Sequence, residues 1–458
     1  MEALLDTLQA FVWGPGTLTL ILGVGLVLTI RLGFVQLRLF PQAWRQFLGG
    51  LRPEGKENGT SPFRALCTAL AATVGTGNLV GVAGAISLGG PGAIFWMWVS
   101  GFLGMATKYA EATLAVRYRE KTSQGYAGGT MYMIRQGLPG SFRLLAWAYG
   151  LFGLLASFGV GNATQISAMV SGIHGVLGTF GFRPAVPGNL LLGLVLAVAV
   201  GWLLWKGSGT IGALAEGLVP LFSAGYILLC AGALAVRAGE LPRAVGMIFQ
   251  GAFSPRAVTG GMLGSGFAAL RVGCSRGTFT NEAGMGTAAM AHAGAEVDNP
   301  CQQGLMGIME VFLDTLVICT LTALVILTSG VAIPYGTDAG TWLTEAAFAG
   351  TYGPGAGIFL AVALSCFAFA TVLGWGLYGR CCAEFLFGPR AGFGFALAQA
   401  AVVVLAACLR ADALWQISEI LNGLMAIPNL VALALLMPET IQLTREYTAC
   451  LRRHPQKK

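Results

Sequence analysis

The stretch Ala69–Ala85, ALAATVGTGNLVGVAGA, decides how this chain folds. It is apolar enough to form part of a membrane helix, but Gly75-Thr76-Gly77-Asn78 interrupts it. An exposed peptide group costs several kcal/mol in hydrocarbon, so a helix opens at mid-depth only where protein or a polar cavity satisfies its backbone. Freed N–H groups favour a carboxylate, and freed carbonyl groups favour a cation. The break predicts a site for an amino acid and sodium, and close helix packing at Gly-x-Gly is the alternative.

The composition is that of a polytopic helical membrane protein. Of the 458 residues, 55% are hydrophobic and 10% are charged, whereas roughly a quarter of the residues in soluble globular proteins are charged. The 68 glycines suit closely packed or broken membrane helices. The net charge of +7 comes from basic residues scattered through short loops, which indicates orientation in a bilayer rather than binding of nucleic acid.

Apolar runs of about 20 residues predict eleven membrane spans. They cover residues 16–32, 63–88, 93–116, 144–173, 189–206, 210–236, 261–278, 304–329, 357–387, 393–409 and 414–437. If the loop after the first span is inside, most of the 27 Lys and Arg residues lie on the inner side. The positive-inside rule then predicts an outer N-terminus and a cytoplasmic C-terminus in the cell membrane of a bacterium, its inner membrane where there are two.

The order of the spans predicts two inverted five-helix repeats. The second span is broken and the seventh is weak by hydropathy, as expected when interrupted helices hold corresponding positions in two halves. The predicted units are an accessory helix with a basic cytoplasmic loop (1–62), the repeats (63–237 and 238–438) and a basic cytoplasmic tail (439–458).

The seventh span contains GFAALRVGCSRGTFTNEAGMG, and we expect its break at Gly273–Gly277. Arginines at mid-membrane usually line an aqueous path or meet a carboxylate. Arg271 or Arg276 is therefore a candidate to bind the substrate carboxylate or to form a gating salt bridge with Glu282. The alternative is that both arginines snorkel or pair structurally with other residues, namely Glu111, Glu216 or Glu310.

Two further spans supply polar candidates. In SCFAFATVLGWGLYGR, Thr371 offers a hydroxyl to sodium and Trp375 shares its face, although bonding of the hydroxyl to its own helix is the alternative. In SFGVGNATQIS, the amides of Asn162 and Gln165 face one way, near Phe158, where they can meet a ligand. Hydrogen bonding between helices is an equally good interpretation of these amides.

The motifs resemble one family over nearly the whole chain. ALAATVGTGNLVGVAGAISLGGPGAIFWMWVSGFLGMATKYAEATLAVRY closely resembles the signature region of bacterial and archaeal alanine or glycine:cation symporters. SRGTFTNEAGMGTAAMAHA, TLVICTLTALVIL, FAFATVLGWGLYG and LNGLMAIPNLVAL resemble its later blocks in the same order. The resemblance implies sodium-coupled transport of small neutral amino acids and an all-α, LeuT-type fold of two inverted five-helix repeats with two broken helices.

The resemblance also implies residue roles. Backbone N–H groups at the first break would take the substrate carboxylate, and Asn78 would lie near the ligand or a cation. Ala370 stands where many LeuT-type carriers have a second hydroxyl, so the sodium site has one oxygen fewer. The expected substrate-binding residues are Gly75, Thr76, Gly77, Asn78, Phe158, Asn162, Gln165, Trp375 and, on the opposite wall, Cys274, Ser275 and Gly277; the expected sodium ligands are the carbonyls of Ala71, Val74 and Phe367 and the hydroxyl of Thr371.

The predicted function is sodium-coupled import of alanine or glycine by alternating access, with sodium as coupling ion and no other cofactor. A glutamine-preferring carrier is one alternative. A proton-coupled carrier, with Glu111, Glu216 or Asp314 carrying the proton, is another. An ion channel is less favoured, because a filter usually needs rings of identical elements. No nucleotide-binding loop and no catalytic motif is present, so an enzyme is not expected.

Overall fold

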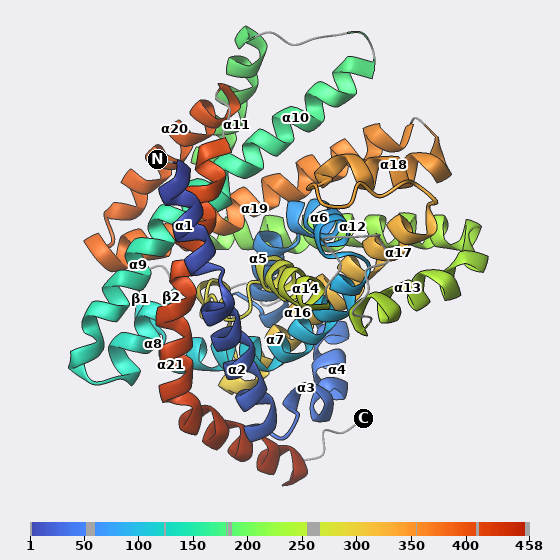
Figure 1. Cartoon of the computed structure of the whole chain (residues 1–458). Coiled ribbons are helices and arrows are strands. Elements are labelled where there is room, and N and C mark those ends of the chain that lie inside the picture. The colour runs from blue at the N-terminus through green and yellow to red at the C-terminus, as the bar shows by residue number, and fades with distance from the viewer. Residues whose placement is uncertain are drawn as a thin grey trace.

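The computed structural model describes residues 2–51, 60–122, 125–179, 181, 186–253, 266–353, 355–408 and 412–453. Almost all of them are helical (Figure 1). The first half contains α1 (Glu2–Val12), α2 (Pro15–Arg31), α3 (Val35–Arg38), α4 (Phe40–Gly50), α5 (Pro62–Thr73), η1 (Gly77–Gly81), α6 (Val82–Gly89), α7 (Gly92–Arg117), β1 (Glu120–Thr122), β2 (Gly125–Ala127), α8 (Thr130–Gly137), η2 (Gly140–Phe142), α9 (Arg143–Phe158), η3 (Gly159–Ala163), α10 (Thr164–Thr179), α11 (Val186–Lys206) and α12 (Ser208–Val236).

The second half continues in the same way. Its elements are η4 (Ala238–Glu240), α13 (Leu241–Phe253), α14 (Gly266–Asn281), α15 (Ala289–His292), α16 (Pro300–Val311), η5 (Phe312–Cys319), α17 (Thr320–Thr328), α18 (Gly340–Tyr352), α19 (Gly355–Phe387), α20 (Ala391–Cys408) and α21 (Asp412–Arg453). Strands β1 and β2 form one antiparallel hairpin. In Figure 1, α1 lies in the upper half of the view and α21 reaches its lower end.

The helices are those of a membrane protein. Among the described residues, seven helices are long and apolar enough to cross a bilayer, and the bent pair α5 and α6 makes an eighth if it is one span. Helix α2 is apolar, but its 17 residues are fewer than the roughly 20 that a span needs. Helix α7 contains the charged residues Lys108, Glu111 and Arg117 and is not among the seven. The number of eleven spans and the repeat layout therefore stay predictions.

The first predicted break is confirmed. Helix α5 ends at Thr73, and Val74 has an extended backbone conformation (φ −76°, ψ 102°). Helix formation resumes with the wide turns of η1, and the axes of the two halves differ by 55°. In Figure 1, α5, α6 and α14 lie together at the centre of the molecule. The break therefore sits among packed helices, as its polar backbone requires.

The second predicted break is wrong in position. Helix α14 runs without interruption through Gly273–Gly277. These glycines serve close packing instead: a Cβ at Gly273 would lie 2.2 Å from the carbonyl oxygen of Ala93, and one at Gly277 would lie 2.3 Å from Ser100 Oγ. The helix ends at Asn281, and Glu282 and two of the next four residues have positive φ before α15 begins at Ala289. Residues 261–265 of this predicted span lie outside the described residues.

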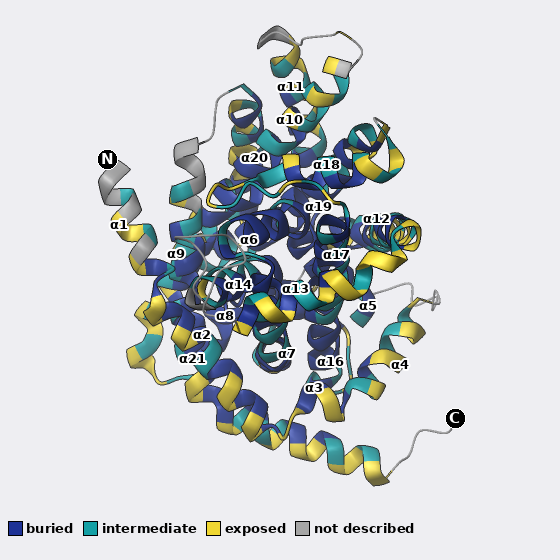
Figure 2. Ribbon diagram, turned by 45° about the vertical axis from the view of Figure 1, so that its right-hand side comes forward, coloured by how far each residue is buried: buried dark blue, intermediate teal, exposed yellow. Residues whose placement is uncertain are grey.

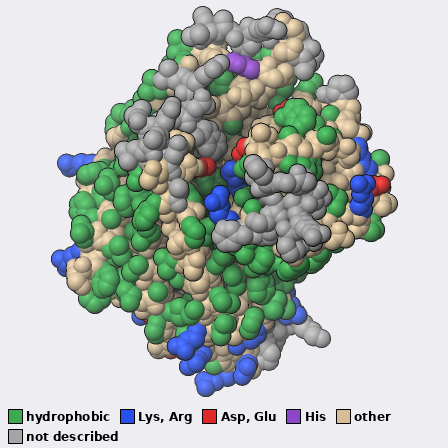
Figure 3. All heavy atoms as spheres, viewed as in Figure 1, with side chains coloured by type: hydrophobic (Ala, Val, Ile, Leu, Met, Phe, Trp, Pro, Cys, Tyr) green, Lys and Arg blue, Asp and Glu red, His purple; other side chains and the backbone are tan. Residues whose placement is uncertain are grey.

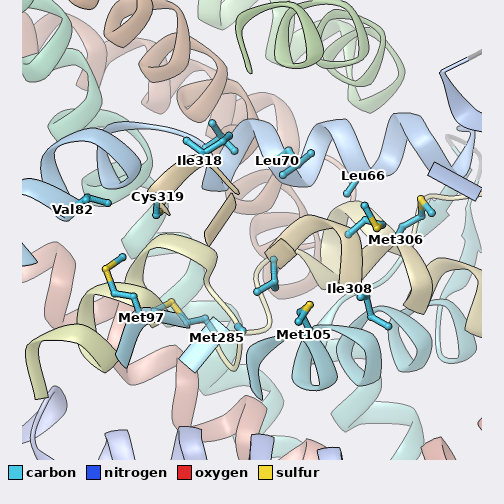
Figure 4. Close-up of a cluster of buried hydrophobic side chains, with 14 of the residues drawn as sticks. Leu66, Leu70, Val82, Met97, Met105, Met285, Met306, Ile308, Ile318 and Cys319 are labelled. Carbon is cyan, nitrogen blue, oxygen red and sulfur yellow. The ribbon is translucent and has the colours of Figure 1, made fainter. Parts of the chain in front are cut away.

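Buried residues lie at the centre, and exposed residues mark the outer helices such as α4 and the end of α21 (Figure 2). The core includes a cluster in which α5, α7, α16 and η5 meet (Figure 4); its labelled members are Leu66, Leu70, Val82, Met97, Met105, Met285, Met306, Ile308, Ile318 and Cys319. Large apolar side chains also face outward, for example Trp202, Trp205 and Leu228. Figure 3 shows hydrophobic side chains over much of one face, as expected for lipid-facing surface, with several Lys and Arg side chains near its lower end.

Candidate functional site

Asn78 shapes the break in the first interrupted helix. Its Oδ1 accepts a hydrogen bond from the backbone N–H of Gly75 at 2.9 Å. Its Nδ2 donates to Asp314 Oδ1 of η5 at 2.6 Å, and the whole side chain is buried. One amide therefore satisfies the loosened backbone and ties it to a second helix. Asn78 does not line the cavity at the break, so the structure places it behind the site.

A small cavity lies directly at the break. Its volume is about 20 Å³, room for about one water molecule, so an amino acid enters only if the walls separate. Thr371 and Trp375 of α19 face the break across it, and α14 closes it with residues from its last turn. The lining residues are Ala72, Thr73, Gly75, Thr76, Gly77, Val160, Gln165, Phe279, Thr280, Glu282, Thr371 and Trp375.

Two of the four oxygens expected to hold sodium lie close together between α5 and α19. Thr371 Oγ1 lies 3.0 Å from the carbonyl oxygen of Ala71. A Cβ on Gly75 would lie only 2.9 Å from the same hydroxyl, so the glycine permits this approach. Val74 and Phe367, the other two expected ligands, are buried next to these residues on the same two segments. Carbonyl and hydroxyl oxygens are hard ligands that suit sodium better than a softer metal.

The candidates of the fourth predicted span separate into two groups. Gln165 lines the cavity, and its Nε2 donates to the carbonyl of Val160 at 3.2 Å. Asn162 instead donates to the carbonyl of Gln399 on α20 at 2.9 Å. Phe158 packs on Phe395 of the same helix, with ring centroids 5.3 Å apart. For Asn162 and Phe158, interhelical packing is what the structure supports, because both contact α20 and neither lines the cavity at the break.

The expected residues of α14 also lie away from the cavity. Cys274 is buried with its sulfur 3.8 Å from the carbonyl of Trp96, and Gly277 packs against α7. Ser275 lines an outer cavity rather than the inner one. Because α14 continues for one more turn than predicted, Phe279 and Thr280 form the wall instead. The sequence signal for the later end of α14 was the pair of glycines in NEAGMG, both of which adopt positive φ.

The arginines of α14 face an outer cavity of 370 Å³, which Trp13, Phe279 and Glu419 also line. Arg276 pairs with Asp338, at 3.2 Å, in the segment before α18. The expected pairing of Arg276 with Glu282 is therefore not observed, because Glu282 is buried deeper. Arg271 lines the same cavity. Of the three glutamates proposed as structural partners, Glu216 pairs with Arg64 and Glu310 with Lys108.

A second outer cavity, of 410 Å³, reaches Thr76 from the side of α10 and α18. Hydroxyl groups line it, together with the carboxyl of Glu345 on α18. Partial burial raises the pKa of Glu345 above its ordinary value. Thr344, its neighbour, donates to the carbonyl of Leu79 in η1 at 2.9 Å. Helix α18 is thus bonded to the broken helix and carries a carboxyl group at the mouth of a path to it.

Buried polar contacts hold the second interruption in place. Glu111 Oε1 accepts hydrogen bonds from the backbone N–H groups of Gly284 and Gly286 at 3.0 and 3.2 Å, and from Asn429 at 2.6 Å. Nearby, Glu310 binds Lys108 at 2.9 Å and His292 at 2.8 Å. Glu111 and Asn429, which donates to the carbonyl of Gly284 at 2.9 Å, thus satisfy non-helical backbone that a membrane interior would otherwise penalise.

Comparison with known proteins agrees with this geometry. The model of the sodium:alanine symporter family matches residues 1–458. A sodium/alanine symporter of Methanococcus maripaludis is 42% identical over 97% of each chain. A probable sodium/glutamine symporter of Bacillus subtilis is 34% identical over 98% of this chain and 91% of its own. The crystal structure of MhsT in complex with L-phenylalanine shares the fold, with a TM-score of 0.56 at 16% identity, over 85% of this chain and 99% of that one.

Proposed function

Because the chain belongs to the sodium:alanine symporter family, we propose that it is a sodium-coupled carrier that imports alanine or glycine by alternating access. The observation that carries the proposal is the cavity between the broken helix and α19, with the hydroxyl of Thr371 beside the backbone at Ala71. A transporter site of this kind lies between half-helices, where loosened backbone binds both solutes. The LeuT-type likeness supports the same mechanism.

In this proposal the substrate carboxylate binds the N–H groups at the start of η1, at Thr76 and Gly77. The partial positive charge of a helix N-terminus favours an anion there. Gln165 and Trp375 bound the space beside them and restrict the size of the side chain.

Sodium binds on the other side of the break in this proposal. The carbonyls of Ala71, Val74 and Phe367 and the hydroxyl of Thr371 supply its oxygens. The membrane potential then drives accumulation, with roughly 2.3 kcal/mol per charge for each 100 mV. We propose further that the N-terminus faces outward and the C-terminus the cytoplasm, with repeats over residues 63–237 and 238–438.

Two alternatives have specific support. Glutamine as substrate is favoured by the relative described as a probable sodium/glutamine symporter. Proton coupling is favoured by a Bacillus subtilis relative described as a putative sodium/proton-dependent alanine carrier, 33% identical, and by the buried carboxyl of Asp314 beside Asn78. Glu216 is a poorer proton carrier, because it is paired with Arg64 and half-exposed.

Uptake into proteoliposomes tests the proposal. Purified protein should accumulate radiolabelled alanine when sodium is outside and should not do so when choline replaces it at the same pH. Equal uptake in sodium and choline would reject sodium coupling, and uptake driven by a pH gradient alone would favour the proton alternative. Competition by unlabelled glycine, alanine, serine and glutamine then ranks the substrates.

A further inference from the structure

Glu282 occupies an unusual position at the end of α14. It is 3% exposed and is one of two residues other than glycine with positive φ (53°) in the described part of the chain. Such a conformation is unfavourable for a residue with a Cβ, and it persists where the surroundings hold it, often at functional sites. Here the conformation turns the chain away from the helix, so that Glu282 lines the same small cavity as Thr76 and Gln165.

The carboxylate of Glu282 is bonded only to neutral donors. Trp375 Nε1 donates to Oε1 at 3.1 Å, and Thr287 Oγ1 donates to Oε2 at 2.5 Å. In the part of the chain that the structure describes, no Lys, Arg or His nitrogen lies within 4.0 Å of it. A carboxylate accepts about four hydrogen bonds, so both oxygens keep capacity on the cavity side.

The two neighbouring buried glutamates have different surroundings. Glu310 has both Lys108 and His292, so the nearest buried lysine is already paired. Glu111 accepts three hydrogen bonds through one oxygen and lines no part of the cavity. Glu282 is the one ionisable side chain among the described residues that line the cavity. A buried carboxylate without a cation is costly, so a cationic group on a bound ligand would complete this site.

We propose that Glu282 binds the ammonium group of the transported amino acid; this rests on the proposed function. The substrate is a zwitterion, with its two charged groups on adjacent bonds of one carbon. The start of η1 takes the carboxylate, and Glu282, on the opposite wall, takes the ammonium. Trp375 and Thr287 fix the carboxylate through their hydrogen bonds. The pair of walls therefore selects α-amino acids and rejects carboxylic and hydroxy acids of the same size.

Calorimetric titration of the purified, full-length protein in saturating sodium tests this. The ligands are L-alanine and propionate, which keeps the carboxylate and lacks the amine. The wild type should bind alanine at least about 100-fold more tightly than propionate, because propionate has no amine and leaves the carboxylate of Glu282 unpaired. In Glu282→Gln the affinity for alanine should fall on the order of 100-fold, and the affinity for propionate should change little. Glu240→Gln, a surface substitution of the same type, should bind both ligands as the wild type does.

The outcomes separate the two proposals. Failure of the wild type to bind alanine at any sodium concentration would overturn the proposed function. Tight alanine binding by Glu282→Gln, with the preference over propionate retained, would overturn only the role of Glu282. If Glu282→Gln does not fold, Glu282→Asp replaces it, because it keeps the charge and shortens its reach. That variant should bind alanine less tightly than the wild type does, with a smaller loss of affinity for propionate. An equal loss of affinity for both ligands would contradict the proposal.

Discussion

The hydroxyl of Thr371 lies 3.0 Å from the carbonyl oxygen of Ala71, 300 positions away in the sequence. A helix in the second half of the chain thus supplies one oxygen to backbone exposed by a break in the first half. The hydroxyl donates its hydrogen to this carbonyl. Under the proposed function, a bound sodium ion would replace this hydrogen bond, and the hydroxyl would turn its oxygen toward the ion.

Thr371→Ala should raise the sodium concentration for half-maximal uptake about 5-fold, since the net contribution of a polar contact is on the order of 1 kcal/mol. Thr371→Ser keeps the oxygen and should stay close to the wild type. The measurement is initial uptake of alanine against sodium concentration at fixed alanine and pH. An unchanged sodium dependence in Thr371→Ala would remove this residue from the site.

Asn78→Ala should abolish uptake in a protein that still folds. The substitution leaves the N–H of Gly75 without its cap and the carboxylate of Asp314 without its amide donor. The break then has no reason to hold its present shape, although most of the core is untouched. Uptake, with size-exclusion elution and melting temperature as folding controls, measures the effect. Near-normal uptake would show that the amide is dispensable.

Asp314→Asn extends the test, because the two side chains are bonded at 2.6 Å. If they act through this contact, the effects of the single substitutions should not add in the double variant. Strictly additive effects on substrate affinity would show that Asn78 and Asp314 act independently.

The membrane class and the first break were predictable from local chemistry, because glycines that interrupt an apolar run cannot be explained by propensity alone. The approach of Thr371 to Ala71 was implied only by the family resemblance, since bonding of the hydroxyl to its own helix was an open alternative. The position of the second break was not predictable in the same way. Gly273 and Gly277 are glycines within an apolar run, as Gly75 and Gly77 are. Their role differs because α7 packs against them.

The side chains that face the site were predicted less well than the elements that carry them. Asn162 and Gln165 are one turn apart, yet one bonds to α20 and the other lines the cavity. Which of the two turns inward depends on the rotation of the helix at the wide turn η3, and sequence spacing does not fix that rotation. The place of Glu282 in the cavity wall was not predicted for a related reason, because it depends on a positive φ.

Trp375→Phe should admit larger amino acids. The indole packs against Gly161, where a Cβ would lie 2.2 Å from Trp375 Cβ, so the ring is held in place and limits the cavity. A smaller ring leaves space, and we expect glutamine to compete with labelled alanine several-fold better than in the wild type. Trp202→Phe, at an exposed position on α11, is the matched control. The same ranking of competitors in wild type and Trp375→Phe would show that another residue sets the size limit.

Glu345→Gln should weaken the apparent affinity for sodium about two- to threefold at low ionic strength, and less at high salt. The carboxylate stands in the outer cavity that leads to Thr76, where a negative charge concentrates cations. Burial raises the pKa of Glu345, so the charge is lost as the external pH falls through that raised value. The wild type should therefore need more sodium at lower external pH.

The variant provides the control for this pH dependence. The side chain at position 345 is neutral at every pH in Glu345→Gln. The variant should therefore need more sodium than the wild type does at neutral pH, and the pH dependence of sodium affinity that Glu345 causes should vanish. Glu240→Gln, on an outer helix away from the cavity, should behave as the wild type does. If Glu345→Gln kept the full pH dependence of the wild type, another group would be responsible.

Trp13→Ala should speed the release of bound alanine to the outside. Trp13, just after α1, donates from Nε1 to the carbonyl of Glu419 on α21 at 2.9 Å, and its ring meets the ring of Phe279 edge-on at 6.2 Å. Phe279 lines both the outer cavity of 370 Å³ and the small inner one, so it separates them. Without the indole, one of the contacts that hold Phe279 closed is gone.

The measurement is the dissociation rate of labelled alanine from purified protein after a chase with excess unlabelled alanine. An aromatic pair contributes on the order of 1 kcal/mol, so we expect Trp13→Ala to release alanine several-fold faster. Trp13→Phe keeps a ring against Phe279 but cannot donate to Glu419, and its rate should fall between the two. Equal rates in all three proteins would mean that the N-terminal segment has no part in closing the site, and that the outer barrier rests on α14 and α18 alone.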